Sequence, residues 1–139
     1  MKVHFTSENI PFPDINTTQI TLWIDAVAKS YGKQVGDIAY IFCNDEKILE
    51  INRQFLHHDY YTDIITFDYS NNNIISGDLV ISLDTVRTNA NEFHQNYTTE
   101  LHRVIIHGIL HLCGINDKGP GEREIMENAE NKALSLIEL

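Results

Sequence analysis

The segment HGILHLCGIND, residues 107–117, carries the strongest structural signal in this chain. It closes a strongly apolar stretch that begins at Thr98 and runs to Gly114. A stretch of this length and composition is typical of a buried helix that ends at a glycine in the left-handed conformation. His107 and His111 are four residues apart, so their rings project from one face of this helix, one turn apart. We therefore expect a central helix that presents two imidazoles to the same point.

A carboxylate follows directly after the predicted helix. Because Gly114 allows the chain to turn back, Asp117 can approach the two histidines. His107, His111 and Asp117 then form a set of three ligands that leaves positions open for water or substrate. The pattern predicts one divalent metal ion, with zinc the expected ion. The alternative is that the histidines are satisfied core residues and that Asp117 is a solvated turn residue.

The residue after the first histidine narrows the chemistry. Zinc peptidases of the HExxH kind carry their general base there, whereas this chain has Gly108. Peptide hydrolysis by that mechanism is disfavoured. A glycine inside a helix costs about 1 kcal/mol relative to alanine, so a compensating contact is expected at Gly108. Close approach of a substrate or another backbone and simple tight packing both remain open explanations.

Two charged residues precede His107 on the same helix face. Arg103 lies one turn before His107, and Glu100 lies one turn before Arg103. Arg103 is a candidate catalytic residue because a guanidinium can bind a phosphate bidentately and stabilise negative charge on its oxygens. The alternative is a surface pair between Arg103 and Glu100 that contributes little.

The remaining pattern predicts an α+β fold. We expect a mixed sheet of about four strands covered by about five helices, with the metal-binding helix at the centre, in a single domain over residues 1–139. The expected strands cover residues 2–6, 35–43, 62–67 and 79–83, the last two adjoining. The expected helices cover residues 16–32, 45–55, 84–94, 98–114 and 122–137. The last helix is expected to have one apolar face, formed by Ile125, Met126, Ala129, Ala133, Leu134 and Ile137.

Composition limits the possible partners. The 139 residues carry a net charge of −10, which is the wrong sign for a broad basic surface that holds nucleic acid, so any such role must be local and no DNA is expected. The N-terminal residues lack the apolar stretch of a signal peptide, and no membrane association is expected. A cytoplasmic protein is expected, with Cys43 and Cys113 reduced in the core.

Three blocks of the sequence resemble the YbeY family. HGILHLCGIND is similar to the family motif H-G-x-L-H-L-x-G-Y-D-H. NRQFLHHDYYTDIITF, residues 52–67, resembles N-x-x-Y-R-x-x-D-x-x-T-D-V-L-S-F, and GDLVIS, residues 77–82, resembles the G-D-I-x-I-S strand. The resemblance covers roughly residues 45–130. It implies a zincin-like fold and a metal-dependent endoribonuclease that cleaves single-stranded RNA in 16S rRNA maturation and ribosome quality control, with a ribosome or ribosomal protein as partner.

Two departures from the family motifs concern the site. The family's third metal histidine falls on Asp117, and a carboxylate hardens the site and lowers its net charge, which leaves metal preference open. The family's arginine falls on Leu56, which cannot contact phosphate. His57, His58 or Arg53 are candidate replacements, with His57 the one we place among the catalytic residues.

Two other functions fit the same residues. One is a non-catalytic ribosome-assembly factor whose metal only locks the central helix to its loop, in which case a fourth protein ligand should close the site. The other is a metal-dependent hydrolase of another substrate, which would be active without RNA.

Overall fold

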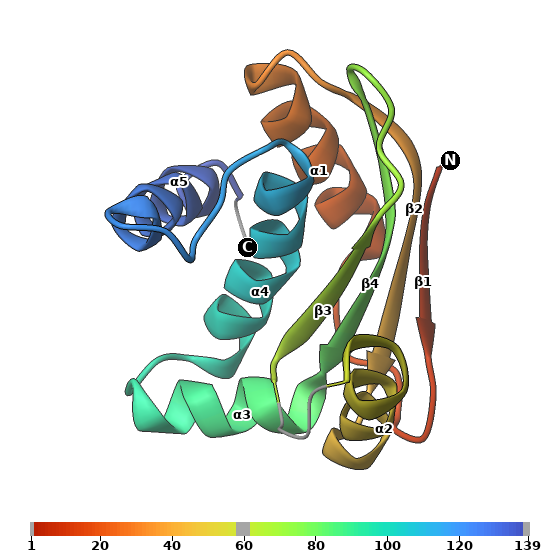
Figure 1. The fold of residues 1–139 in the computed structure, drawn as a ribbon. Coiled ribbons are helices and arrows are strands. Elements are labelled where there is room, and N and C mark those ends of the chain that lie inside the picture. The colour runs from red at the N-terminus through yellow and green to blue at the C-terminus, as the bar shows by residue number, and fades with distance from the viewer. Residues whose placement is uncertain (1, 58–61, 138–139) are drawn as a thin grey trace.

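The structure, a computed structural model, describes residues 2–57 and 62–137 and contains one mixed four-stranded sheet (Figure 1). The strand order is β1-β2-β4-β3, with β1, β2 and β4 parallel and β3 antiparallel to β4. The strands are β1 (Val3–Ser7), β2 (Gln34–Cys43), β3 (Ile64–Asp68) and β4 (Ile74–Ser82). The helices are α1 (Thr17–Ser30), α2 (Asp45–Leu56), α3 (Leu83–Glu92), α4 (Tyr97–Leu112) and α5 (Glu122–Leu134).

The two faces of the sheet carry separate apolar cores. The larger core joins one face of the sheet to α1, α4 and α5, and its largest fully buried side chains include Tyr40 and Phe42. The smaller core lies under α2, where Ile48 packs with Ile65 and Val80. Figure 1 shows α1 and α4 on one side of the sheet and α2 on the other. The predicted α+β architecture, with four strands and five helices in the described residues, is confirmed.

Helix α4 lies directly on the sheet. Its N-cap, Asn96, accepts hydrogen bonds from two backbone N–H groups of the first turn, and the buried Tyr40 hydroxyl donates to the Ile105 carbonyl at 2.7 Å. A Cβ atom on Gly108 would lie 2.9 Å from Leu79 Cδ2 and 3.1 Å from Ile64 Cδ1. Tight packing against the sheet therefore accounts for the glycine, because a Cβ atom there would force the Leu79 and Ile64 side chains on β4 and β3 to shift.

Several element boundaries differ from the sequence expectation. β4 begins at Ile74 rather than residue 79, because its first residues pair with Gln34 and Val35 of β2. Helix α5 ends at Leu134 rather than residue 137. Ile125, expected on the apolar face of α5, is instead 60% exposed.

The cysteines and the helix lengths bear on two further expectations from the sequence. Cys43 is buried, Cys113 is half-buried, and both are free thiols. None of the helices in the described part of the chain has the length and apolar character needed to span a bilayer.

Candidate active site

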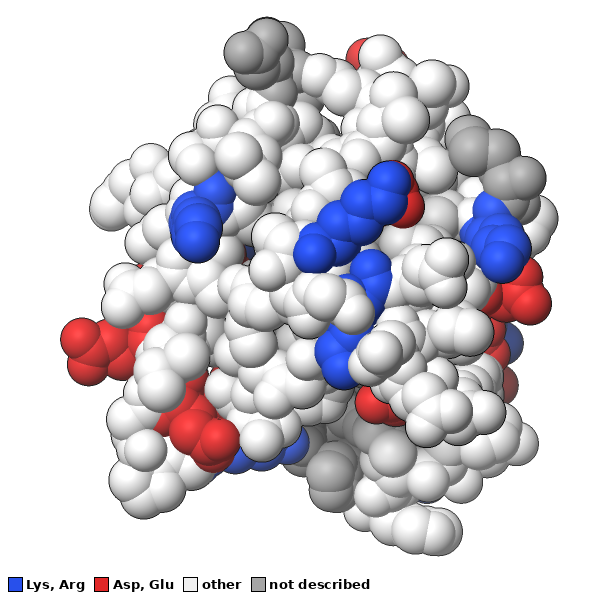
Figure 2. All heavy atoms as spheres, turned by 90° about the horizontal axis from the view of Figure 1, so that it is seen from above, with Lys and Arg blue, Asp and Glu red and all other residues white. Residues whose placement is uncertain are grey.

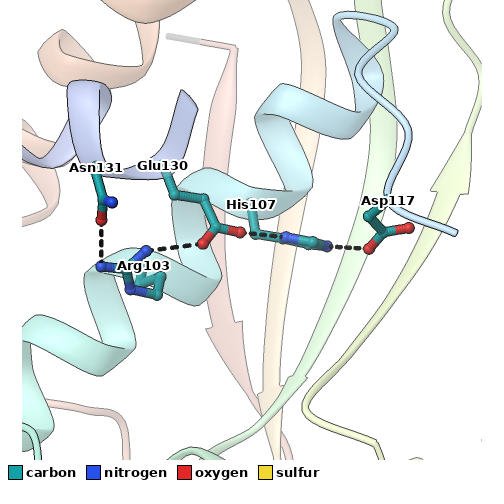
Figure 3. A network of polar contacts seen from close by, with 5 residues as sticks. All are labelled: Arg103, His107, Asp117, Glu130 and Asn131. Carbon is teal, nitrogen blue, oxygen red and sulfur yellow. Dashed lines mark hydrogen bonds and ion pairs between the residues drawn. The ribbon is translucent and has the colours of Figure 1, made fainter. Parts of the chain in front are cut away.

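The candidate site is built around His107 on α4. Its Nδ1 lies 2.6 Å from Glu130 Oε2, and its Nε2 lies 3.3 Å from Asp117 Oδ2. Figure 3 shows the imidazole held between these two carboxylates, one from α5 and one from the turn after α4. Nδ1 donates its hydrogen bond to the Glu130 carboxylate, and Nε2, the other ring nitrogen, faces Asp117. The ring orientation is therefore fixed on both sides.

Charge explains the protonation states of this pair. Burial opposes the charged imidazolium, but the hydrogen bond and negative charge of Glu130, with Asp117 and Asp63, outweigh it and raise the pKa of His107. Burial also opposes ionisation of Glu130, but hydrogen bonds from His107 and Arg103 hold its pKa below the usual range. Both shifts favour a protonated imidazole paired with an ionised carboxylate.

Arg103 belongs to the same network. Its Nη1 donates to Glu130 Oε1 at 2.9 Å and its Nη2 donates to Asn131 Oδ1 at 2.7 Å. Within the described residues, Arg103 forms its ion pair with Glu130 and not with Glu100. The alternative of a surface pair between Arg103 and Glu100 is therefore wrong, and Glu100 is buried. Arg103 therefore ties α4 to α5 beside His107.

Two further carboxyl groups lie near this network. Burial raises the pKa of Asp63, with a smaller opposing effect from His107, and burial raises the pKa of Glu100, opposed by Arg103. Asp63 is contributed by the segment that leads into β3, and Glu100 by the first turn of α4. The site thus concentrates acidic groups around one imidazole and one guanidinium.

Two cavities share Asp63, His107 and Asp117, which line both of them. The smaller, about 270 Å³, is also lined by His111, Thr62 and Lys118. The larger cavity, about 530 Å³, is lined by residues from the first part of α4, the end of α3 and α5. An extended ligand can therefore approach the His107 and Asp117 pair from two sides.

The three predicted metal ligands share the smaller cavity. His107, His111 and Asp117 all line it, so the structure brings them to one space. Zinc bonds of about 2.0–2.2 Å at tetrahedral angles separate two ligand atoms by roughly 3.4 Å, close to the 3.3 Å between His107 Nε2 and Asp117 Oδ2. Nevertheless, in residues 2–57 and 62–137 no three His, Cys, Asp or Glu side chains are grouped closely enough to hold an ion as they stand. The donor set fits a divalent ion, and the ligand assignment stays a prediction.

The proposed replacements for the family's arginine lie around the end of α2. Leu56, at the arginine position, lines the smaller cavity. His57 follows it as the C-cap in the left-handed conformation, is exposed, and lines neither cavity. Arg53 is exposed on α2, and His58 lies outside the described residues. The catalytic role of His57 stays a prediction.

Sequence reasoning missed Glu130 and Asn131. Glu130 is 8% exposed although it is ionisable, and it lies four residues after Met126 and three before Ala133, both buried. The sequence could have predicted a paired carboxylate at this position, because an isolated acidic residue on the apolar face of a helix is usually paired. Its partners on α4 were not visible.

This fold and site define an α+β domain whose central helix presents a hydrogen-bonded histidine to two cavities. The sequence model of the family described as Endoribonuclease YbeY matches residues 3–138. The chain belongs to the YbeY family of endoribonucleases, nucleases that hydrolyse RNA.

Individual relatives agree over nearly the whole chain. It is 69% identical to the Endoribonuclease YbeY of Phocaeicola vulgatus over 137 residues, which cover 99% of both chains. It is 52% identical to that of Porphyromonas gingivalis, covering 98% of this chain and 90% of the relative. A solution structure of a Thermotoga maritima protein, TM1509, matches with a TM-score of 0.66 at 25% identity, covering 96% of this chain and 87% of that one.

Proposed function

We propose that this protein is a metal-dependent endoribonuclease that cleaves single-stranded RNA during maturation of 16S rRNA in the cytoplasm. The observation that carries the proposal is the shared cavity lined by His107, His111 and Asp117, in a chain of the YbeY endoribonuclease family. These three side chains would hold one divalent ion, which we propose is zinc. When bound, the ion supplies Lewis acidity for a phosphoryl oxygen.

The carboxylate of Glu130 supports the ligand role of His107. Metal-binding histidines usually donate their other ring N–H to a carboxylate, which fixes the tautomer and raises the basicity of the ligating nitrogen. Glu130 accepts from Nδ1 at 2.6 Å, and this arrangement leaves Nε2 facing Asp117 and the cavity. This hydrogen bond supports the proposed ligand role of His107 Nε2.

Arg103 has a positioning role in this proposal as well as a candidate role at phosphate. Its guanidinium is held by Glu130 and Asn131, yet it lines the larger cavity with 28% of its side chain exposed. A guanidinium fixed in this way can present a remaining N–H to a phosphate without losing rotamer freedom on binding. His57 would reach the RNA from outside the cavities.

The charge of the molecule suggests how RNA is recruited. On the face in Figure 2, Lys and Arg side chains occur in small groups separated by uncharged surface. With a net charge of −10, the free protein should bind RNA weakly and with strong salt dependence. We propose that a ribosomal protein presents the RNA at high effective concentration, and that this setting also serves ribosome quality control.

The decisive experiment measures metal content and RNA cleavage on the same samples. We expect about one metal ion per chain in the wild type, and loss of both the ion and cleavage of a single-stranded RNA in His111→Ala. His4→Ala is the matched control, because His4 is exposed on the edge strand β1. Metal retained by His111→Ala would contradict the ligand assignment.

The same experiment separates the alternatives. A wild type that binds metal but cleaves no RNA would support the structural metal site of an assembly factor. Hydrolysis of other phosphodiesters with no activity toward RNA would support a hydrolase of another substrate.

A further inference from the structure

The larger cavity extends well beyond the groups that the proposed reaction uses. Its lining also includes Phe93, Gln95, Arg123 and Glu127, which belong to the end of α3, the α3–α4 turn and the first turns of α5. The volume of about 530 Å³ is in the range of small-molecule sites. None of these four side chains belongs to the His107 network.

Phe93 is an exposed aromatic ring at the edge of this cavity. It is 56% exposed, and within the described residues it stacks on no other aromatic ring. Its backbone is nevertheless fixed: the Phe93 N–H donates to the Asn89 carbonyl at 2.9 Å, and the Gln95 N–H donates to the Ala90 carbonyl at 2.8 Å. An exposed apolar ring on a fixed backbone is suited to stacking against a flat ligand, because little backbone order must be gained on binding.

Arg123 adds a positive charge to the lining of the same cavity. It is exposed, and in the part of the chain that the structure describes it forms no ion pair. By contrast, the guanidinium of Arg103 is already bonded to Glu130 and Asn131. Arg123 is therefore a second cation in this cavity, and unlike Arg103 its guanidinium is not already bonded to a carboxylate in the described residues.

Charge determines which part of a nucleotide can enter the cavity. Glu100 and Glu130 also line the cavity and are only 6% and 8% exposed, so the buried part of its lining is acidic and disfavours a phosphate. A neutral nucleobase carries no such penalty and can donate its N–H groups to carboxylate oxygens. The favoured arrangement places the base inside the cavity and its phosphate at the rim.

We propose that Phe93 and Arg123 form a nucleotide subsite for the substrate RNA, in which an unpaired base stacks on Phe93 while Arg123 contacts its phosphate. This inference rests on the proposed function, because the cavity opens onto His107 and Asp117. It places the RNA on one side of the His107 and Asp117 pair in the larger cavity, and the RNA on the other side in the cavity that His111 lines. The subsite requires single-stranded RNA, since a paired base cannot expose its face to the ring.

The test measures binding in the presence of a chelator, so that no cleavage occurs, with a fluorescent single-stranded RNA of twelve nucleotides. We expect Phe93→Leu to weaken binding about tenfold, as loss of one base–aromatic stack does, and Phe93→Trp to preserve it. Tyr69→Leu is the control, because Tyr69 is 62% exposed and lines neither cavity. Equal affinity of wild type and Phe93→Leu would overturn the subsite.

Abasic substitution locates the stacked base. In a series of RNAs with one abasic nucleotide each, one position should weaken binding to the wild type by the same factor as Phe93→Leu. The Phe93→Leu variant should be insensitive at that position. If the two losses instead multiply at every position, the base does not stack on Phe93 and the proposal is wrong.

The salt dependence tests Arg123. Loss of one phosphate contact should reduce the slope of log affinity against log salt by about 0.7 for single-stranded RNA. We expect this change for Arg123→Ala and none for Lys29→Ala, which removes an exposed lysine paired with Asp25. An unchanged slope for Arg123→Ala would remove Arg123 from the subsite. If the wild type cleaves RNA and both Phe93→Leu and Arg123→Ala bind RNA normally, the subsite is refuted and the proposed function stands. If the wild type neither binds nor cleaves RNA, both proposals are refuted.

Discussion

Glu130 on α5 accepts a hydrogen bond from Nδ1 of His107 on α4, at 2.6 Å across 23 residues of sequence. The other oxygen of the same carboxylate accepts from Arg103. One side chain thus fixes the ring orientation of the central histidine and joins the C-terminal helix to the site. The last helix is therefore part of the site as well as a cover for the core.

Replacing this carboxylate should weaken metal binding. We expect Glu130→Gln to lower zinc affinity about 10- to 100-fold, because His107 loses the charged acceptor that orients it and raises its basicity. Competition with a fluorescent chelator measures the affinity. Glu127→Gln is the matched control, since Glu127 is exposed on the same helix and has no contact with His107 in the described structure. Equal affinities for wild type and Glu130→Gln would contradict the orienting role.

The metal-free protein should lose stability as pH rises from about 6.5 through the raised pKa of His107. The pKa of His107 is raised on folding, so its contribution is complete below the unfolded value of about 6.5 and is lost as pH rises through the folded value. Urea unfolding in a chelator, at a series of pH values, measures the effect. Glu130→Gln should flatten this dependence, and an identical pH profile for the variant would show that another group is responsible.

His102 should produce the opposite pH dependence. It is buried against Trp23, its Nδ1 has no hydrogen-bond partner among the described residues, and burial lowers its pKa. Because the unfolded chain binds the proton more tightly, stability falls as pH drops below about 6.5. We expect His102→Phe to increase the free energy of unfolding more at pH 5 than at pH 8, since phenylalanine keeps the aromatic contact with Trp23 and cannot be protonated. An equal change at both pH values would contradict this explanation.

Alanine at position 108 should be destabilising even though it is the better helix former. The helix gains about 1 kcal/mol, but overpacking typically costs about 1–3 kcal/mol, and the new methyl would press on Leu79 and Ile64. We expect a net loss of stability by urea unfolding, together with weaker metal binding as α4 shifts. Asn91→Ala on the exposed face of α3 is the control, with a change within about 0.5 kcal/mol. A stabilised Gly108→Ala would show that the core can absorb the methyl group.

Asp117 should set the metal preference of the site. We expect Asp117→His to raise the affinity for zinc relative to manganese, because imidazole suits zinc whereas a carboxylate suits harder ions. Competitive titration with the two ions measures the ratio, with Asp117→Asn as a control that removes the charge without adding an imidazole. An unchanged ratio in Asp117→His would place Asp117 outside the coordination sphere.

The sequence by itself was sufficient to predict the family, the α+β fold class and the helix that carries His107 and His111. These properties depend on local periodicity, caps and short motifs, which neighbouring residues determine. The approach of Asp117 to His107 was also predictable, because Gly114 ends the helix only three residues earlier and adopts a positive φ of 102°.

Tertiary structure decided what the sequence left open. The packing explanation for Gly108 depended on side chains from β3 and β4, and the early start of β4 depended on its pairing with β2. The partner of Arg103 came from α5, 27 residues away, and not from Glu100 on its own helix. Such contacts join segments that are distant in sequence, and only the packing of helices on the sheet fixes which polar groups meet. Local pattern therefore determined the helix, its histidines and the approach of Asp117, while the fold determined the Glu130 carboxylate and the cavities around them.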